Sequence, residues 1–337
     1  MKITKIPGLG RFGVFIDDVD LFNITDAEWN EIGQLHMKSL VTIIRNTNLD
    51  VKTYQNLIKK ITLDRNTITL DWKQKYGSNY FERGINDDPE IDEIDRIAMK
   101  ELGNMCVDQT IRVSNKRNEN GDRIGMFAEG ELLWHSNESG RLIFTPGVSL
   151  LGHANMIGSS TGFLTTTDYY ENVSESFRSE LDEMILLHRF QPGRINPGLN
   201  KTQDTVMYHN MCPQDDVEIP LIIQSPAGIK GLHYSVNTVY SIKGMTKAES
   251  DSVFAEIDKE LFVEKYIYDH WYQSNTDLCL FDNSITLHRR LGDVKDRECY
   301  RLQHDYLPLV GPYNPYLQEE FKQRYASELG KYGDLYD

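Results

Sequence analysis

The sequence predicts an α+β protein with a mainly β core, either a sandwich or a jelly roll, and with helices flanking that core. The principal observation is the texture of the chain from about residue 124 onward, where short apolar runs are separated by Gly, Pro and Asn. Many short strands joined by turn residues are typical of antiparallel architectures, whereas alternating β-α units would place a long helix between successive strands. The apolar runs lie at 131–134, 142–145, 148–151, 219–223, 232–241 and 278–287.

The second observation is that helical signals are few and lie mostly outside these runs. Thr25 and Glu28 have the spacing of a capping box, which predicts a helix whose apolar face continues to Ile44. A further helix is expected at 51–61, and residues 12–22 predict a strand because their side chains alternate in part between apolar and polar.

Within the β region, helices are expected at 169–188 and at 246–262, the second of which also opens on a capping-box spacing. Residues 88–124 are polar and predict an irregular segment that ends in an exposed hairpin tip at 115–123. The stretch 191–216 is polar and contains Pro and Gly. Because loops of that length inside a compact domain are usually functional or disordered, we interpret it as a lid-like insertion.

We therefore predict one domain over residues 1–337. It comprises a helical and strand portion at 1–123, a jelly-roll core at 124–310 that carries the insertion at 191–216, and a C-terminal helix and tail at 311–337.

Composition excludes several classes of partner. The net charge of −15 argues against nucleic acid, because binding to phosphates requires a basic face. The four cysteines show no CxxC pair and are interpreted as free thiols in a reducing compartment. No apolar run approaches the roughly 18 residues that cross a membrane, and the first residues lack the apolar segment of a signal peptide. These features predict a cytoplasmic protein without a membrane partner. The oligomeric state, including a homo-oligomer, is left open.

Two histidines carry the chemistry. His135 ends an apolar run and is followed by the turn-forming pair Ser-Asn, and His288 ends a second run far along the chain. A His-x-carboxylate turn and a distant His can offer three ligands to one face of a non-haem Fe(II) and leave the opposite face open. Either histidine alone is more simply interpreted as a structural residue. Asn137 stands where the carboxylate of such a site would be.

Arg297 and Arg301 follow the second histidine. A guanidinium can bind a carboxylate through two parallel hydrogen bonds, so this pair suggests an anchor for a co-substrate acid. The alternative is a surface ion-pair network with Asp293, Asp296 and Glu298.

Several segments of the chain together resemble the taurine dioxygenase/TfdA family of Fe(II)- and 2-oxoglutarate-dependent oxygenases, over roughly residues 8–310. The resemblance includes the opening strand, the family's Trp-His-x-Asp motif in the form Trp-His-Ser-Asn, a Gly-Ser-Ser-Thr segment, a late Phe-Asp-Asn block that ends in His, and two arginines four residues apart. These segments lie at 10–21, 134–137, 158–161, 281–288 and 297–301, with further matches at 170–172, 220–223, 231–234 and 244–251.

The resemblance implies a double-stranded β-helix, the jelly roll of the clavaminate synthase-like type. It also implies that His135, Asn137 and His288 hold Fe(II), while 2-oxoglutarate chelates the metal and places its distal carboxylate on Arg297 and the Thr161 hydroxyl. Arg301 either joins in holding 2-oxoglutarate or binds an anionic group of the substrate. The implied activity is a dioxygenase reaction in which O2 oxidises a small polar or anionic metabolite, by hydroxylation as the default, with release of succinate and CO2.

The departure at Asn137 leaves four accounts open. The amide oxygen ligates the metal more weakly; or Glu138 replaces it; or the position is vacated for water or an anion, as in halogenating relatives; or the site is silent and the fold binds a small molecule. A carboxylate brings a full charge, and two unit charges about 4 Å apart interact by roughly 4 kcal/mol at an effective dielectric near 20. Metal affinity is therefore expected to be lower than with Asp or Glu.

Two further expectations concern rivals and substrate contacts. A Zn-dependent hydrolase or a simple binder on the same jelly roll is the rival class, although neither predicts the arginine pair. On the substrate side, the candidates are weakly determined and comprise Glu131, Tyr80, Phe81, Arg141 and the lid-like insertion.

Overall fold

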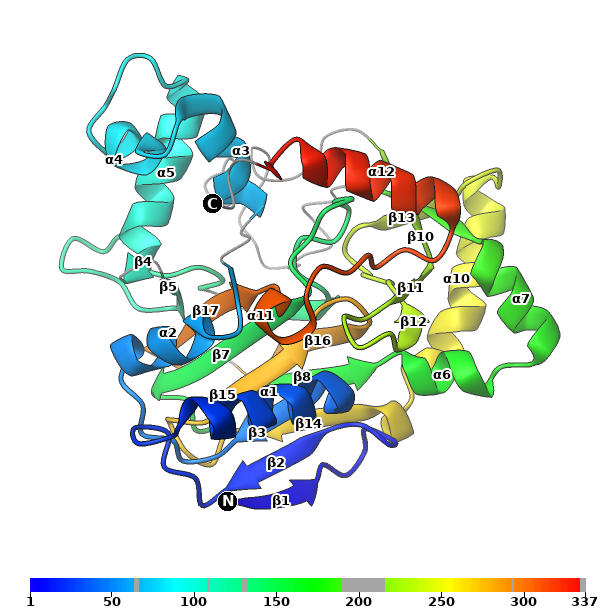
Figure 1. Ribbon diagram of the computed structural model, residues 1–337, viewed down its shortest axis with the longest axis horizontal. Helices are drawn as coiled ribbons and strands as arrows, with labels where there is room; N and C mark the ends of the chain where they lie inside the picture. The colour runs from blue at the N-terminus through cyan, green and yellow to red at the C-terminus, as the bar shows by residue number, and fades with distance from the viewer. Residues whose placement is uncertain (64–66, 108–109, 129–131, 190–215, 293, 334–337) are drawn as a thin grey trace.

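Two β-sheets face each other at the centre of the molecule (Figure 1). The computed structural model describes residues 1–337 except 64–66, 108–109, 129–131, 190–215, 293 and 334–337. Within the described residues, the larger sheet has eight strands in the order β1-β2-β3-β15-β7-β17-β5-β4, and the smaller has four in the order β14-β8-β16-β6. Their pairings are antiparallel apart from β2 with β3.

The strands of the larger sheet are β1 (Lys2–Lys5), β2 (Val14–Asp17), β3 (Val41–Ile44), β4 (Cys106–Val107), β5 (Thr110–Ser114), β7 (Gly147–Ala154), β15 (Leu278–Asp282) and β17 (Glu298–His304). Those of the smaller sheet are β6 (Leu132–His135), β8 (Ser160–Thr165), β14 (Ile267–Trp271) and β16 (Thr286–Leu291). Two minor sheets contain β9 (Ile185–His188), β10 (Val217–Pro220) and β13 (Val239–Ile242), and β11 (Ile222–Gln224) and β12 (Lys230–Leu232).

The main core lies between the two large sheets. Phe281 of β15 meets Phe163 of β8 with ring centroids 5.2 Å apart, and Val148 packs in the same cluster. The other face of the larger sheet is covered as well, because Leu278 and Leu280 pack with residues of the helices α1 and α2. A strand buried on both faces should be apolar at every position, which explains the continuous Leu-Cys-Leu-Phe run of β15.

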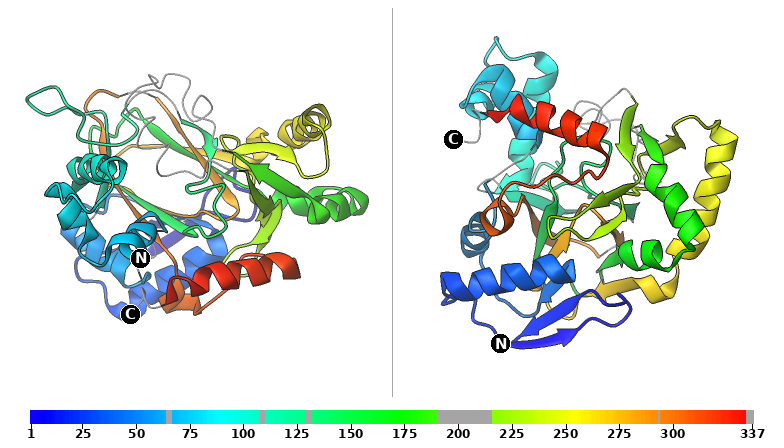
Figure 2. Two further views of the ribbon diagram at one scale, coloured as in Figure 1. Left: turned by 90° about the horizontal axis from the view of Figure 1, so that it is seen from above. Right: turned by 45° about the vertical axis from the view of Figure 1, so that its right-hand side comes forward.

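Helices cover the outer faces of the sheets and both ends (Figures 1 and 2). Helix α1 lies across the larger sheet, α4 and α5 project at one corner, and α7 and α10 lie together on the opposite side. The helices are α1 (Asp26–Ser39), α2 (Val51–Lys59), α3 (Thr67–Tyr76), α4 (Tyr80–Ile85), α5 (Glu93–Met105), α6 (Thr167–Asn172), α7 (Glu175–Glu183), α10 (Lys247–Leu261), the 3₁₀ helix η1 (Glu264–Tyr266), α11 (Leu307–Val310) and α12 (Glu319–Gly330).

The predicted α+β jelly roll is confirmed, and both capping boxes form. The Thr25 hydroxyl accepts from the Glu28 amide while the Glu28 carboxylate accepts from the Thr25 amide, and Thr246 and Glu249 repeat this arrangement. The hairpin tip at 115–123 also forms, with a bridge between Arg117 and Arg123.

Two of the predicted helices are shorter in the structure than the sequence suggested. Helix α1 ends at Ser39, where Leu40 takes a φ of 60°, and the β-branched run that follows becomes the buried strand β3. The helix expected at 169–188 is instead α6, α7 and the strand β9. The apolar residues of β9 fit a helical spacing, but they pair with β10 and β13, so tertiary pairing decides their conformation.

Residues 88–124 were wrongly expected to be irregular, because α5 occupies 93–105. Its buried residues Ala98, Met99, Leu102 and Met105 follow helical spacing, but charged neighbours obscure the pattern. The run at 142–145 is not a strand: Phe144 stacks on the ring of His233 with centroids 4.9 Å apart. The insertion at 191–216 lies outside the described residues except for Asp216.

Among the described residues, no helix is long and apolar enough to span a membrane. Of the cysteines that can be placed, Cys106, Cys279 and Cys299 are free thiols.

Candidate active site

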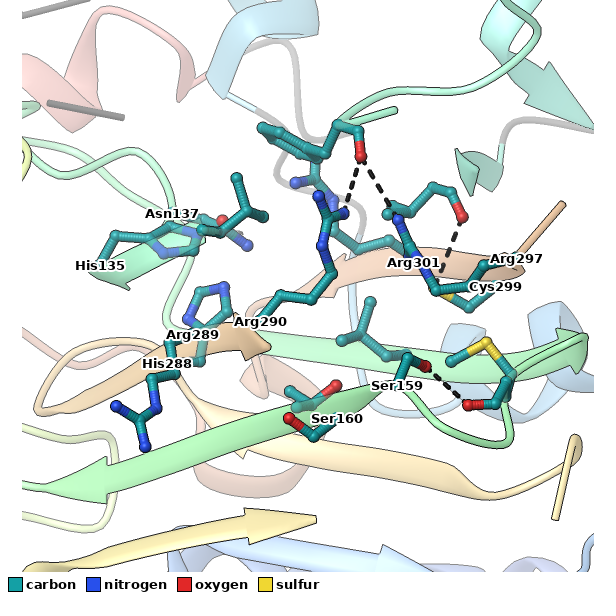
Figure 3. Close-up of a pocket in the computed structure, with 16 residues that line it drawn as sticks. His135, Asn137, Ser159, Ser160, His288, Arg289, Arg290, Arg297, Cys299 and Arg301 are labelled. Atoms are coloured by element: carbon teal, nitrogen blue, oxygen red, sulfur yellow. Dashed lines mark hydrogen bonds between the residues drawn. The ribbon is translucent and has the colours of Figure 1, made fainter. Parts of the chain in front are cut away.

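The two histidines singled out in the sequence lie side by side. In the pairing of β6 with β16, His135 is directly opposite His288, and residues opposite each other in an antiparallel pair project from the same face of the sheet. Their ring centroids are 4.0 Å apart (Figure 3). The strand pairing therefore joins two side chains that are remote in the sequence.

Asn137 lies in the turn just after β6 and lines the same pocket as the two histidines. Its backbone is held by the buried side chain of Asn283. The amide oxygen of Asn283 accepts from Asn137 N at 2.7 Å, and its amide nitrogen donates to the carbonyls of Asn137 and Thr145 at 2.9 and 2.8 Å. Since Asn283 belongs to the turn between β15 and β16, it links the segment of Asn137 to the segment of His288.

Burial keeps both imidazoles neutral. It lowers the pKa of His135 to about 4 and that of His288 well below its ordinary value. The Nδ1 of His135 donates to the carbonyl of Leu133 at 2.7 Å, because a carbonyl can only accept. The Nε2 of His135 therefore carries a lone pair. A neutral imidazole with a free lone pair is the form that binds a metal.

The residues present fit a divalent transition-metal ion. A buried ring nitrogen of a pocket residue, His288 Nδ1, has no hydrogen-bond partner among the described residues. Two imidazoles and an amide oxygen form a possible ligand set, although one with less negative charge than a set containing a carboxylate. Accordingly, the described part of the chain contains no cluster of three or more His, Cys, Asp and Glu side chains suited to a metal.

The carboxylate of Glu138 is engaged in a backbone hydrogen bond. Its carboxylate accepts from the amide of Thr145 at 2.7 Å, and its backbone has a φ of 58°. This geometry gives no support to Glu138 as a substitute ligand.

Four arginines contribute to the lining of the pocket: Arg289 and Arg290 of β16, Arg297 just before β17, and Arg301 of β17. The guanidinium of Arg289 is bonded to Asp269, so the other three are the candidates for binding a ligand. The empty space of the pocket is about 510 Å³ when its opening to solvent is included.

Arg297 is only 2% exposed, and in the described part of the chain it pairs with neither Asp296 nor Glu298 of the expected surface network, whose third member, Asp293, lies outside the described residues. Glu298 pairs instead with Arg112 at 3.3 Å and with Lys116.

Thr161 of β8 lines the pocket as well. Its hydroxyl shares a hydrogen bond of 3.0 Å with the hydroxyl of Tyr272, which is fully buried. When Tyr272 donates this bond, the hydroxyl proton of Thr161 is free to point into the pocket.

The structure thus brings together all six residues predicted from the sequence: His135, Asn137, Thr161, His288, Arg297 and Arg301. Arg290 was missed, although it follows His288 by two residues and therefore projects from the same face of the strand. Recognising β16 as a strand beyond His288 would have identified it.

Other candidates lie elsewhere. Tyr80 and Phe81 belong to α4 and pack in a separate cluster with Trp72. Arg141 lies in the turn that follows Glu138, bonded through its amide to the carbonyl of that residue. Glu131 lies outside the described residues.

Comparisons with known proteins agree with this arrangement. The model of the family described as taurine catabolism dioxygenase TauD, TfdA family matches residues 2–303. A crystal structure of AAD-2 in complex with Mn(II) and N-oxalylglycine superposes with a TM-score of 0.61 at 18% identity, covering 89% of this chain and 96% of that one. A taurine dioxygenase from Burkholderia xenovorans superposes with a TM-score of 0.58 at 17% identity, covering 89% and 88%.

No curated protein matches the sequence. At such low identities the solved structures establish the shared jelly-roll fold alone. The family model covers most of the chain, from the first strand to the arginine pair. On that ground, this chain belongs to the TauD/TfdA family of dioxygenases.

Proposed function

We propose that this protein is an Fe(II)- and 2-oxoglutarate-dependent oxygenase that oxidises a small polar or anionic metabolite, with hydroxylation as the default outcome. The observation that carries the proposal is the convergence of two neutral imidazoles, with ring centroids 4.0 Å apart, in a pocket that also contains buried arginines. Membership of the family and the likeness in fold support it.

In this proposal His135, His288 and the amide oxygen of Asn137 hold the metal. When bound, Fe(II) and 2-oxoglutarate supply the activation of O2, which oxidises the substrate as the keto acid is converted to succinate and CO2. That AAD-2 forms a complex with Mn(II) and N-oxalylglycine, an oxalyl compound, is consistent with a metal and a keto acid in this fold.

The chain's own residues bind and orient these ligands. Arg297 provides a buried positive charge for the distal carboxylate, and the hydroxyl of Thr161 is placed to donate a second hydrogen bond to it. Arg301, which enters from β17, is available to the co-substrate or to an anionic group of the substrate. Arg297 and Thr161 are buried, and hydrogen bonds are stronger where the surroundings exclude water.

The test is direct. Metal-free protein is mixed anaerobically with Fe(II) and 2-oxoglutarate, and the visible charge-transfer absorption of the chelate is recorded. We expect an absorption band that saturates with 2-oxoglutarate in the native protein and is lost in Arg297→Met. If no band develops at high concentrations of both ligands, the oxygenase proposal is wrong.

A second candidate is favoured by one observation, the absence of a carboxylate at position 137. In that case the protein binds a small anion in the arginine-lined pocket without catalysing a reaction. Release of succinate in the presence of O2, stimulated by a member of a metabolite panel, separates the two functions. Analysis of the oxidised product would then decide between hydroxylation, halogenation and desaturation.

A further inference from the structure

One backbone carbonyl connects two of the arginines that line the pocket. The oxygen of Phe127 accepts from Nη1 of Arg290 at 2.7 Å and from Nη2 of Arg297 at 3.4 Å, as the dashed lines in Figure 3 show. Arg290 comes from the smaller sheet, whereas Arg297 precedes a strand of the larger sheet. Two guanidinium groups from opposite walls therefore converge on a single oxygen atom.

The residue that supplies this oxygen has an unusual backbone. Phe127 has a φ of 53°, in the left-handed region that bulky side chains rarely adopt, and such conformations cost on the order of 1–3 kcal/mol. Its ring also lies beneath the Arg301 guanidinium, 5.6 Å from centroid to Cζ. The strained conformation is one that turns the carbonyl toward the arginines.

Arg297 retains hydrogen-bonding capacity in this arrangement. The side chain is 2% exposed, its Nε has no partner within the described part of the chain, and its bond to Phe127 is long. A guanidinium has five N–H donors, so most of those on Arg297 remain available to a ligand. A carboxylate forms hydrogen bonds with guanidinium groups roughly twice as strong as those of a neutral carbonyl.

We propose that Arg290 and Arg297 act as a two-guanidinium clamp for the distal carboxylate of 2-oxoglutarate, and that the shared carbonyl of Phe127 holds the two guanidinium groups side by side. The inference rests on the proposed function and adds Arg290 to its binding residues. A clamp of two charges selects a keto acid with a second carboxylate. Pyruvate, which lacks that group, gains nothing from the clamp.

The chain offers a matched control for Arg290 in its neighbour Arg289. Because side chains alternate along a strand, the guanidinium of Arg289 lies on the opposite face of β16, as Figure 3 shows. There it pairs with Asp269 at 2.6 and 3.0 Å and lies over the ring of Trp134, 4.4 Å from its centroid. Substituting either arginine by Met removes the same charge from adjacent positions.

The experiment measures binding by calorimetric titration of the Mn(II)-loaded protein, without turnover. In Arg290→Met we expect the Kd for 2-oxoglutarate to rise at least tenfold and the Kd for pyruvate to stay unchanged, while Arg289→Met alters neither. Combining Arg290→Met with Arg297→Met should weaken binding by less than the product of the single effects, since both groups hold one carboxylate.

The inference is overturned if Arg290→Met binds 2-oxoglutarate as tightly as Arg289→Met does, or if it weakens pyruvate and 2-oxoglutarate equally. Should Arg290→Met fail to fold by circular dichroism, Arg290→Lys keeps the charge and removes the fork; an unchanged affinity in that variant would overturn the clamp. If the native protein itself does not bind 2-oxoglutarate, the failure belongs to the proposed function.

Discussion

At the scale of single residues, Asn137 is held firmly in the wall of the candidate site. Its backbone is fixed by hydrogen bonds to the side chain of Asn283, and the residue is only 8% exposed. The amide nitrogen of Asn137 has no hydrogen-bond partner among the described residues. An amide has the same shape as a carboxylate but lacks its charge. The geometry of the turn therefore suits an acidic ligand, while the chemistry at its tip does not provide one.

Restoring the carboxylate tests the role of this position. In Asn137→Asp we expect the affinity for Fe(II) to rise at least tenfold, which corresponds to about 1.4 kcal/mol, a modest fraction of the interaction between full charges at this range. Release of succinate without substrate should rise as well. Metal titration followed by a competing chelator provides the measurement, and Asn137→Ala is the control. An affinity equal to that of the native protein would show that residue 137 does not contact the metal.

The sequence motifs identified side chains that the fold brings into one pocket, while the roles of these side chains stay predictions. His135, Asn137, His288, Arg297 and Arg301 all lie in such motifs, and all line one pocket. Arg290 and Phe127 were missed for different reasons. Arg290 depends on strand alternation beyond the motif, and the backbone of Phe127 depends on contacts with residues remote in the sequence, which no local pattern specifies.

At the scale of elements, the site depends on the passage of the chain from one sheet to the other. Strand β15 belongs to the larger sheet and β16 to the smaller one, and the short turn between them contains Asn283. The same turn is anchored by Asp282, whose carboxylate accepts from the amides of Ser284 and Ile285 at 2.9 and 2.8 Å. The turn between β15 and β16 therefore fixes the position of His288 relative to that of Asn137.

Removing the side chain of Asn283 should release this coupling. Asn283→Ala loses three hydrogen bonds at a fully buried position, so we expect the free energy of unfolding to fall by about 2–4 kcal/mol. Metal affinity should fall by at least tenfold in protein that remains folded, because the turn of Asn137 is no longer held. Urea unfolding and metal titration measure the two effects.

Asn314 provides the matched control for that change. It also joins two backbone segments, through bonds of 3.1 Å to the carbonyl of Lys322 and 3.0 Å from the amide of Tyr316, but it lies in the loop before α12. Asn314→Ala should lower stability and leave metal affinity unchanged. Equal losses of metal affinity in the two variants would mean that Asn283 acts only through general stability.

Elements with local signals were predicted, and those that depend on pairing were not. The capping boxes at Thr25 and Thr246 specified the starts of α1 and α10 from a few adjacent residues. Strand β9 was assigned to a helix because Ile185–His188 acquires its conformation from β10 and β13. Strand β17 was not predicted because Arg301 and Gln303, on one face of the strand, interrupt the apolar alternation. Of these two polar residues, Arg301 lines the pocket.

At the scale of the whole molecule, the mainly β architecture followed from the frequency of short apolar runs, but the strand order could not. Strand β3 pairs with β15, which lies near the other end of the chain, and with β2 in parallel. Such pairings are determined by which apolar faces can be buried together, and composition alone does not rank them. The buried interior also contains several histidines, and their protonation affects the stability of the fold.

Four buried histidines outside the candidate site have lowered pKa values. Burial lowers the pKa of His36 to about 3 and that of His233 to about 4, and it lowers those of His188 and His304 well below the ordinary value of 6.5. Burial also raises the pKa of Asp282 from 3.8 to about 7. The folded chain therefore keeps these rings neutral in mildly acidic solution, whereas the unfolded chain protonates them.

The direction of the pH dependence follows. Below about pH 6.5 the unfolded state binds more protons at the four rings, so their contribution to stability is complete above that pH and is lost as pH falls toward 4. Asp282 acts in the opposite sense, because its protonated folded form contributes stability that is lost as pH rises through 7. Four rings outweigh one carboxyl, which leaves an excess of about three protons from these five groups, and His135 and His288 add to that excess in the metal-free protein.

We therefore expect the protein to unfold in mild acid. Each excess proton corresponds to about 1.4 kcal/mol per pH unit once fully developed, so a loss of roughly 4 kcal/mol per unit between pH 6 and 5 would remove most of an ordinary domain's stability. His304→Phe should reduce the slope by about one proton. Neither ring nitrogen of His304 has a partner among the described residues, so the substitution sacrifices no hydrogen bond while it removes a titrating group. Urea unfolding across a pH series, with the native protein in the same buffers, measures both slopes, and identical slopes for the two proteins would contradict the assignment of acid sensitivity to the buried rings.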